Sequence, residues 1–172
     1  MSSANPRITS QEFHQYAGAA NNGIVALSKA VAASSLDPEL QQLVKLRASQ
    51  INGCAFCIQL HLNESRLMGI AAPRLDLLAV WREAGVFSDR EKAALQWTEL
   101  LTRLSEHHVT DADYAAVSHH FAPSELAWLS TAIGVINIWN RIAAPFQYAP
   151  PIPRHPIQQA VKETSSEPAT VS

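Results

Sequence analysis

Two cysteines and one histidine are the side chains with the clearest chemical potential in this sequence. Cys54 and Cys57 are separated by two residues, and His61 follows four residues after the second cysteine. If a helix begins near Cys54, the three side chains share one face, and the imidazole lies close to the second thiol. Helix N-terminal amides and an adjacent base both favour the reactive thiolate. The spacing therefore predicts a dithiol redox site with its own base.

The chemistry expected of such a pair is a cycle between dithiol and disulfide. Two thiols at this spacing can close a disulfide without large backbone motion. The attacked thiol becomes a sulfenic acid, and the other cysteine resolves it to the disulfide. The helix start alone favours Cys54 as the more acidic thiol, whereas the neighbouring His61 favours Cys57. The residues by themselves leave the two roles open.

Zinc binding is an alternative for the same three residues. Cys54, Cys57 and His61 could supply three ligands, but a structural zinc site takes four, usually from two chain segments. No second ligand pair at convincing spacing is found among the other histidines, which are His14, His107, His108, His119, His120 and His155. The adjacent histidine pairs are expected to be surface residues near helix ends. A further alternative is that both cysteines pack as small hydrophobic residues.

Residues 8–144 are predicted to form one helix after another. Asp37 followed by Pro38 is typical of a helix N-cap with proline at the first helical position. Asn52 and Gly53 predict the end of that helix, because both tolerate the left-handed conformation found there. A new helix should then begin at about Cys54, which places the redox site at a helix start.

Three more helix starts follow. Ser88 with Glu91 and Thr110 with Asp113 match the capping box, and Pro123 opens the last long helix. The apolar face after Ser88 consists of Ala93, Ala94, Trp97, Leu100, Leu101 and Leu104. The apolar positions of the last helix are Leu126, Leu129, Ile133, Ile136 and Ile138. No segment alternates with period two for long, so the predicted fold class is all-α.

The predicted organisation is a single all-α domain over residues 1–147 and a tail over residues 148–172. Six of the ten prolines fall at or after Pro145, which predicts an extended or disordered tail. The last helix is apolar nearly all round, which indicates burial on several sides or a subunit interface. Asn140 and Arg141 interrupt it and are expected to join a polar network or a subunit contact.

Composition excludes several classes of protein. The chain has 172 residues, of which 47% are hydrophobic and 16% charged, so it can bury a core of ordinary size. Its net charge of −2 gives no electrostatic footprint for nucleic acid or an anionic membrane. No apolar stretch reaches the roughly 20 residues of a membrane span, and the N-terminus does not look like a secretory signal. We therefore expect a cytoplasmic protein without nucleic-acid or membrane partners.

Three segments of this sequence resemble the AhpD-like alkylhydroperoxidase family, within the broader carboxymuconolactone decarboxylase superfamily. They are LVKLRASQINGCAFCIQLHLNESRLMGI at 43–70, WREAGVFSDREKAALQWTELLTRL at 81–104 and INIWNRIA at 136–143. The resemblance covers residues 35–148. It implies an AhpD-like helical bundle that assembles into homo-trimers or hexamers. It also implies a peroxiredoxin-type antioxidant enzyme that reduces hydroperoxides without a cofactor or metal and draws electrons from a dithiol reductant protein.

The resemblance also implies roles for individual residues. Cys57 attacks the peroxide, Cys54 resolves the sulfenic acid and meets the reductant, and His61 assists proton transfer. The family relay commonly includes a glutamate twelve residues before the first cysteine, and here that position is Gln42. Glutamine can orient a hydrogen bond but cannot take a proton at neutral pH. Gln42 is therefore expected to be a weaker member of the catalytic set.

Two other departures affect proton handling. Some family members have a histidine between the cysteines, where this chain has Phe56, and the carboxylate nearest to Gln42 in sequence is Glu39. Proton transfer then depends on His61 or water, and slow peroxidase turnover is expected. The leading hypothesis is a thiol-dependent peroxidase. The alternatives are a dithiol-disulfide oxidoreductase that serves as a redox relay or sensor, then a zinc-binding helical interaction module, and last a decarboxylase of the superfamily.

Overall fold

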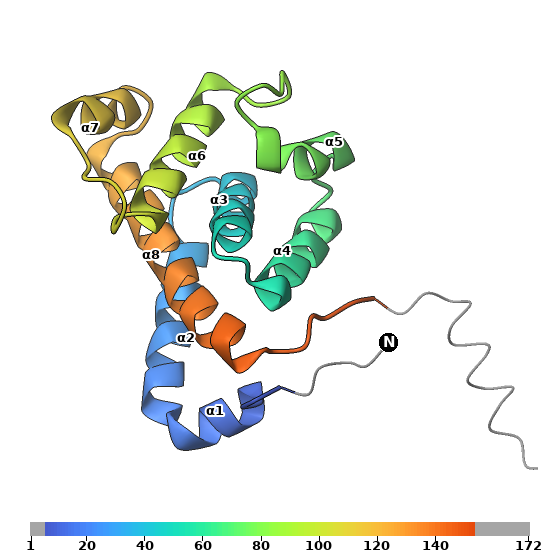
Figure 1. The fold of residues 1–172 in the computed structure, drawn as a ribbon. Coiled ribbons are helices and arrows are strands. Elements are labelled where there is room, and N and C mark those ends of the chain that lie inside the picture. The colour runs from blue at the N-terminus through green and yellow to red at the C-terminus, as the bar shows by residue number, and fades with distance from the viewer. Residues whose placement is uncertain (1–5, 154–172) are drawn as a thin grey trace, which may run out of the picture.

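The computed structural model describes residues 6–153. Within this range the chain forms eight α-helices, one short 3-10 helix and no strand, which confirms the predicted all-α class. None of these helices combines the length and apolarity needed to cross a membrane. Figure 1 shows α3 at the centre, with α4, α6 and α8 packed around it. The elements are α1 (Ser10–Tyr16), α2 (Gly18–Ala32), α3 (Pro38–Ile51), α4 (Ala55–Leu67), α5 (Ala72–Asp76), η1 (Leu78–Val80), α6 (Asp89–Thr102), α7 (Asp111–Ser118) and α8 (Pro123–Phe146).

Side-chain caps form at three of the helix starts that the sequence predicts. At the start of α3, Asp37 accepts a hydrogen bond of 2.8 Å from the amide of the third helical residue. Ser88 and Glu91 form a reciprocal capping box for α6, and Thr110 and Asp113 form one for α7. Each cap satisfies amides that have no partner within the helix and contributes about 1 kcal/mol.

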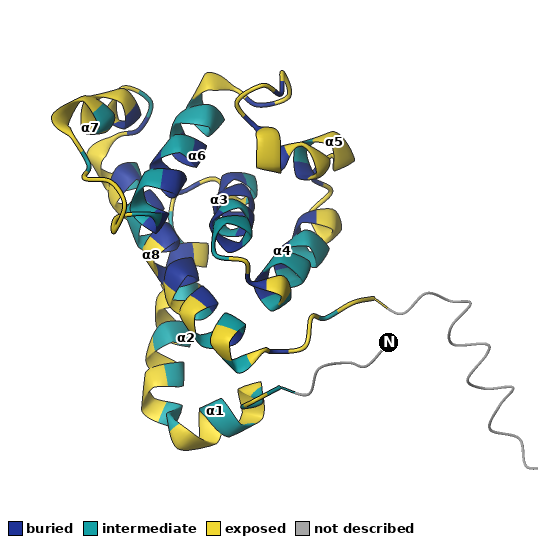
Figure 2. Ribbon diagram, in the orientation of Figure 1, coloured by how far each residue is buried: buried dark blue, intermediate teal, exposed yellow. Residues whose placement is uncertain are grey.

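The central helix α3 is buried on most of its surface, as Figure 2 shows. Its buried apolar side chains are Leu40, Leu43, Val44, Leu46 and Ala48. Burial of one leucine side chain stabilises the fold by roughly 1.5–3 kcal/mol. This helix is therefore a rigid base for the residues that follow it at the start of α4.

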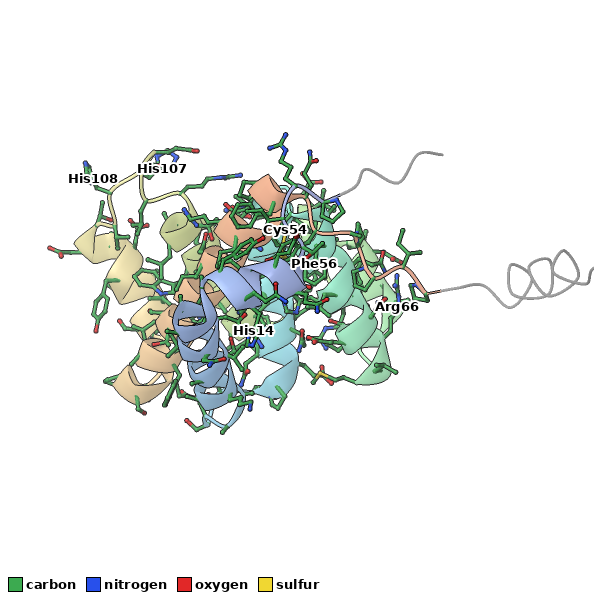
Figure 3. All side chains as sticks on the ribbon, turned by 90° about the horizontal axis from the view of Figure 1, so that it is seen from below. His14, Cys54, Phe56, Arg66, His107 and His108 are labelled. Carbon is green, nitrogen blue, oxygen red and sulfur yellow. A yellow bond between two sulfur atoms is a disulfide. The ribbon has the colours of Figure 1, made fainter. Side chains whose placement is uncertain are left out.

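The paired histidines lie away from the cysteines. Figure 3 shows His107 and His108 at one edge of the molecule, on the connection between α6 and α7, and Cys54 nearer its centre. His119 and His120 follow α7, and their rings meet edge to face with centroids 5.1 Å apart. All four residues lie near helix ends, as predicted.

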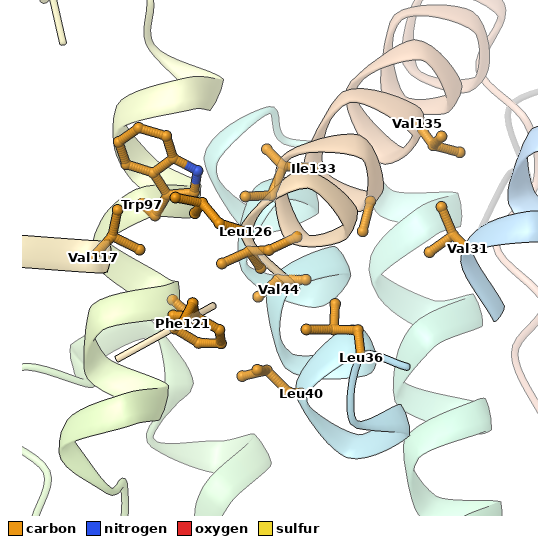
Figure 4. Packing of buried hydrophobic residues seen from close by; sticks show 13 residues of the cluster. Val31, Leu36, Leu40, Val44, Trp97, Val117, Phe121, Leu126, Ile133 and Val135 are labelled. Atoms are coloured by element: carbon orange, nitrogen blue, oxygen red, sulfur yellow. The ribbon is translucent and has the colours of Figure 1, made fainter. Parts of the chain in front are cut away.

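The largest core cluster joins α2, α3, α6, α7 and α8 (Figure 4). Its labelled members are Val31, Leu36, Leu40, Val44, Trp97, Val117, Phe121, Leu126, Ile133 and Val135. A second cluster lies on the other side of α3 and includes Leu43, Leu46, Leu78, Trp81 and Leu95. Because both clusters contain residues of α3, they hold the helix from two sides.

Two apolar positions that were assigned to buried faces are exposed. Leu104 is 53% exposed because α6 ends at Thr102, so the chain has left the helix before it reaches this residue. Ile138 is 39% exposed on α8, where its neighbour Asn137 faces the interior instead. The prediction was wrong for these two residues. It is confirmed for the other apolar positions named in α8, which are Leu126, Leu129, Ile133 and Ile136.

Beyond α8 the described chain is irregular and packs against the body of the protein. Tyr148 is buried, and the Asn63 side chain of α4 donates a 2.8 Å hydrogen bond to the Pro151 carbonyl. Residues 148–153, the first part of the predicted tail, thus follow the end of α8 at Phe146. Most of it, residues 154–172, lies outside the described part of the chain.

Candidate redox site

The first cysteine lies at a tight turn between α3 and α4. Asn52 ends α3, and Gly53 adopts the left-handed conformation with φ of 65°. A side chain at this φ would be strained, which explains glycine here. The Cys54 amide then donates to the Ser49 carbonyl at 3.1 Å, and the Cys54 sulfur caps α4 by accepting from the Cys57 amide at 3.3 Å. The predicted helix break and helix start are both confirmed.

A partly buried network of polar side chains connects this turn to α8. The Asn52 amide nitrogen donates to the side-chain oxygens of Asn137 and Asn140, at 3.0 and 2.9 Å. Asn140 in turn donates to the Ser49 hydroxyl at 3.1 Å, and Arg141 donates to the Asn137 side chain at 2.9 Å. These contacts explain the polar residues inside an otherwise apolar helix, and they confirm the predicted polar network.

The two cysteines form a disulfide in this structure. Their Cα atoms are 5.3 Å apart, which lies within the range of a protein disulfide. Cys54 and Cys57 are both buried, with 0% and 2% of their surfaces exposed. In residues 6–153, no group of three or more histidine, cysteine, aspartate or glutamate side chains could hold a metal ion, so the zinc alternative gains no support there.

His61 lies one turn after Cys57 on α4, and its side chain is 10% exposed. Its Nδ1 atom is 3.1 Å from Gln42 Oε1 and 3.1 Å from Glu64 Oε2. An amide oxygen and a carboxylate are both acceptors, so this network assigns the imidazole proton to Nδ1. Nε2 then carries the lone pair and is the nitrogen that can accept a proton.

Glu64 and Lys45 belong to the site, although the sequence analysis did not select them. Hydrogen bonding to His61 is the main effect that lowers the pKa of Glu64; burial opposes it, and the His61 charge, the Gln42 amide and the Lys45 charge add to it. Burial lowers the pKa of Lys45, and the charge of Glu64 partly offsets that effect. The i,i+3 spacing of His61 and Glu64 was the signal that could have identified this pair.

An apolar cavity of about 400 Å³ opens beside the second cysteine. Cys57, His61 and Glu64 line it, and Cys54 does not. Its apolar lining comes from α1, α2, α4, α8 and the segment after α8, and includes Phe13, Val25, Val31, Phe56, Leu60, Val135, Ile136, Trp139, Ala143 and Tyr148. A small organic molecule in this cavity would contact one sulfur of the pair and the imidazole next to it.

Aromatic side chains close the cavity near the disulfide. Phe56, between the two cysteines, meets the Tyr148 ring edge to face with centroids 5.6 Å apart. Figure 3 shows Phe56 next to Cys54 at the start of α4. Burial raises the pKa of Tyr148, whose hydroxyl has no hydrogen-bond partner among the described residues. Phe56 thus contributes an apolar wall at the position where some AhpD-like proteins have a histidine.

Comparison with known proteins decides the family. Residues 18–100 match the carboxymuconolactone decarboxylase family. The uncharacterised protein YdfG of Bacillus subtilis is 39% identical over 110 residues, which cover 64% of this chain and 75% of that protein. This chain belongs to the carboxymuconolactone decarboxylase family. YnjA of Escherichia coli, also uncharacterised, is 31% identical over 108 residues, or 63% of this chain and 59% of that protein.

Solved structures place this family member among AhpD-like folds. A protein of unknown function from Agrobacterium tumefaciens, named as a candidate AhpD antioxidant defence protein, has a TM-score of 0.82 at 36% identity. The match covers 87% of this chain and all of that one. A peroxidase-related protein from Silicibacter has a TM-score of 0.68 at 22% identity, covering 75% of this chain and 69% of that one. The debrominase Bmp8 has a TM-score of 0.64 at 14% identity, covering 83% and 74%; these last two show the fold alone.

At position 42 the AhpD-like pattern has a charged glutamate, whereas this carboxymuconolactone decarboxylase family member has the neutral Gln42. Gln42 contacts His61 through a neutral amide. Glu39, the nearest carboxylate in sequence, forms an ion pair with Arg74 at 2.5 Å instead. The carboxylate that contacts the imidazole is Glu64, from the same helix as His61.

Proposed function

We propose that the protein is a cofactor-free, thiol-dependent peroxidase that reduces organic hydroperoxides through Cys54 and Cys57, an antioxidant activity of the peroxiredoxin type. The observation that carries this proposal is the apolar cavity, which reaches Cys57 and His61 and is not lined by Cys54. A hydroperoxide bound there would meet a single sulfur beside a base. This arrangement supports Cys57 as the attacking thiol, in agreement with the family resemblance.

The reaction balances with these groups and an external dithiol. Nε2 of His61 takes the proton of the Cys57 thiol, and the thiolate attacks the terminal oxygen of the hydroperoxide. The O–O bond breaks, Cys57 becomes a sulfenic acid, and the leaving alkoxide takes the proton from the imidazolium to give an alcohol. The Cys54 sulfur then attacks Cys57, which forms the disulfide and releases water. A dithiol reductant returns both cysteines to thiols.

Reduction of the disulfide requires local opening of the chain. Both sulfurs are buried, and Cys54 lies beneath the turn that Asn52 and Gly53 form. A protein reductant can reach them only when this turn, or the segment around Tyr148, moves aside. The role that the resemblance gives to Cys54, as the contact for the reductant, therefore needs an opened state.

The test uses reduced protein and one equivalent of cumene hydroperoxide, with peroxide loss, free thiols and intact mass followed together. We expect stoichiometric peroxide loss and an intramolecular disulfide. Cys57→Ser should reduce the rate at least about 1,000-fold, because the nucleophile is lost. Cys54→Ser should form one sulfenic acid and then stop. A Cys57→Ser variant that kept the wild-type rate would contradict the assignment.

A redox relay is the second candidate, and Gln42 is the observation that favours it. The neutral amide gives His61 no charge support from the position where the AhpD-like pattern has glutamate. A slow peroxidase could still exchange electrons rapidly with another protein disulfide. Thiols that are inert to hydroperoxide but exchange quickly with a disulfide substrate would favour the relay.

We also propose a cytoplasmic homo-oligomer, a trimer or hexamer as the family resemblance implies. A dithiol that must be reduced again fits a compartment that keeps thiols reduced. Exposed apolar side chains on the chain, among them Leu67, Val80 and Ile138, would be available for contacts in such an assembly. Sedimentation equilibrium should give three or six times the chain mass, and a monomer at micromolar concentration would contradict the proposal.

A further inference from the structure

We propose that Glu64 supplies the carboxylate of the site's proton relay, in place of the glutamate that this chain lacks at position 42. The inference rests on the proposed thiol chemistry of Cys57 and His61. Glu64 acts through the imidazole, so it is a positioning residue. It completes a carboxylate–imidazole–thiol arrangement in which the carboxylate and the imidazole both come from α4 and are one turn apart.

The contact has the geometry that such a relay needs. Glu64 Oε2 is 3.1 Å from Nδ1 of His61, and both side chains line the cavity together with Cys57. A carboxylate that accepts from Nδ1 holds the tautomer in which Nε2 is free to take a proton. It also stabilises the imidazolium that forms when Nε2 takes it. The Gln42 oxygen shares the first task, but as a neutral group it contributes far less to the second.

Hydrogen bonds and nearby positive charge favour the ionised form of Glu64. The titratable groups that line the cavity with it are Lys45 from α3, Cys57 and His61 from α4, and Tyr148 after α8. The lining from α1, α2 and α8 is apolar or neutral, with Ser10, Asn21 and Ser28 as its polar members. Lys45 is therefore the cation that offsets the Glu64 charge. The hydrogen bond from His61 is the largest effect that lowers the pKa of the Glu64 carboxyl; the His61 charge and the Gln42 amide contribute less, and the Lys45 charge contributes least.

Glu64 is far more exposed than the imidazole that it contacts. The Glu64 side chain is 42% exposed, whereas the His61 side chain is 10% exposed. In the proposed step, the Cys57 proton moves to Nε2, and Glu64 stabilises the resulting imidazolium across the Nδ1 hydrogen bond. The imidazolium then gives that proton to the departing alkoxide. Glu64 remains ionised throughout, so no further acid or base is required.

The test removes the carboxylate at position 64 and then introduces one at position 42, on the other side of His61. In a Cys54→Ser background, the rate at which iodoacetamide alkylates Cys57 is measured against pH. Glu64→Gln should raise the midpoint of this profile by about one pH unit, because the thiolate–imidazolium pair loses its anion. Below the midpoint the rate should fall about 10-fold. The double variant Gln42→Glu/Glu64→Gln places a carboxylate on the other side of Nδ1 and should restore the midpoint.

Glu106→Gln is the matched control, since this exposed glutamate lies in the turn after α6 and should leave the profile unchanged. A Glu64→Gln profile that superimposes on the parent would overturn the proposal. A raised midpoint that the double variant does not restore would also overturn it, because Glu64 would then act only through local structure. The alkylation assay needs no peroxide. A shifted profile in a protein that does not react with hydroperoxide would therefore support the role of Glu64 in proton transfer and contradict the proposed peroxidase function.

Discussion

Two glutamates packed against α3 show how the same side chain can serve different purposes. Glu99 of α6 is 8% exposed and accepts hydrogen bonds from Arg47, Trp81 and Arg82, each at 2.8 Å. Glu64 of α4 is 42% exposed and shares the Nδ1 hydrogen of His61 with Gln42. One carboxylate has its acceptor sites filled by fixed donors, and the other keeps most of them open to the cavity or solvent.

The pKa values of the two carboxyls have different causes. Burial alone would raise the pKa of Glu99, but hydrogen bonds from Arg82, Trp81 and Arg47, with the Arg47 charge, lower it to about 2. For Glu64 the main partner is a histidine that itself exchanges protons. A carboxylate surrounded by permanent donors ties helices together, whereas one beside an imidazole can take part in proton transfer.

The largest expected difference between the two sites is in the free energy of unfolding when each glutamate is replaced by glutamine. Glu99→Gln should lower the free energy of unfolding by about 2–3 kcal/mol at pH 7, because Arg47 and Arg82 lose their counter-charge. Glu64→Gln should change it by less than about 0.5 kcal/mol, because that carboxylate is half exposed. Urea unfolding at constant pH measures both. Equal losses at the two positions would contradict the division between a structural and a chemical glutamate.

The same two glutamates predict how the free energy of unfolding depends on pH under acidic conditions. Glu99 has a lowered pKa when folded, so its contribution is complete above about pH 4.5 and is lost as the pH falls toward 2, where the folded group also protonates. That contribution is at most about 3 kcal/mol. Glu99→Gln should therefore remove much of the decrease in stability over this range, and Glu64→Gln should leave most of it.

A smaller effect is expected from the two basic residues of α3 that face these glutamates. Arg47→Met should lower the free energy of unfolding by about 2 kcal/mol, because Glu99 keeps its burial and loses an ion pair. Lys45→Met should change it by less than about 1 kcal/mol, with stabilisation expected, because burial already disfavours the ammonium charge. Thermal unfolding of both variants at pH 7 measures the difference. A Lys45→Met loss as large as that of Arg47→Met would mean that the cavity charges also hold the fold together.

The helices and the redox motif could be predicted from the sequence because they depend on local interactions. The caps at Asp37, Ser88 and Thr110 act within one turn, so their residue types alone indicate where helices begin. Gly53, directly after Asn52, likewise ends α3 through its own preference for the left-handed conformation. Leu104 was misjudged because apolar spacing continues after α6 has ended, and spacing does not report the last hydrogen bond of a helix.

The sequence by itself determined the all-α class, the helix start at Cys54 and the placement of Cys57 and His61 one turn apart, since these depend on contacts within a few residues. Spacing alone places Glu64 one turn from His61 on α4, but tertiary structure decided which side chain of α3 meets the imidazole. Glu39 and Gln42 lie one turn apart on α3, yet Glu39 pairs with Arg74, whereas the neutral Gln42 contacts His61. Helical periodicity assigns a residue to a face, but only the packing of α3 against α4 and α8 decides what that face meets.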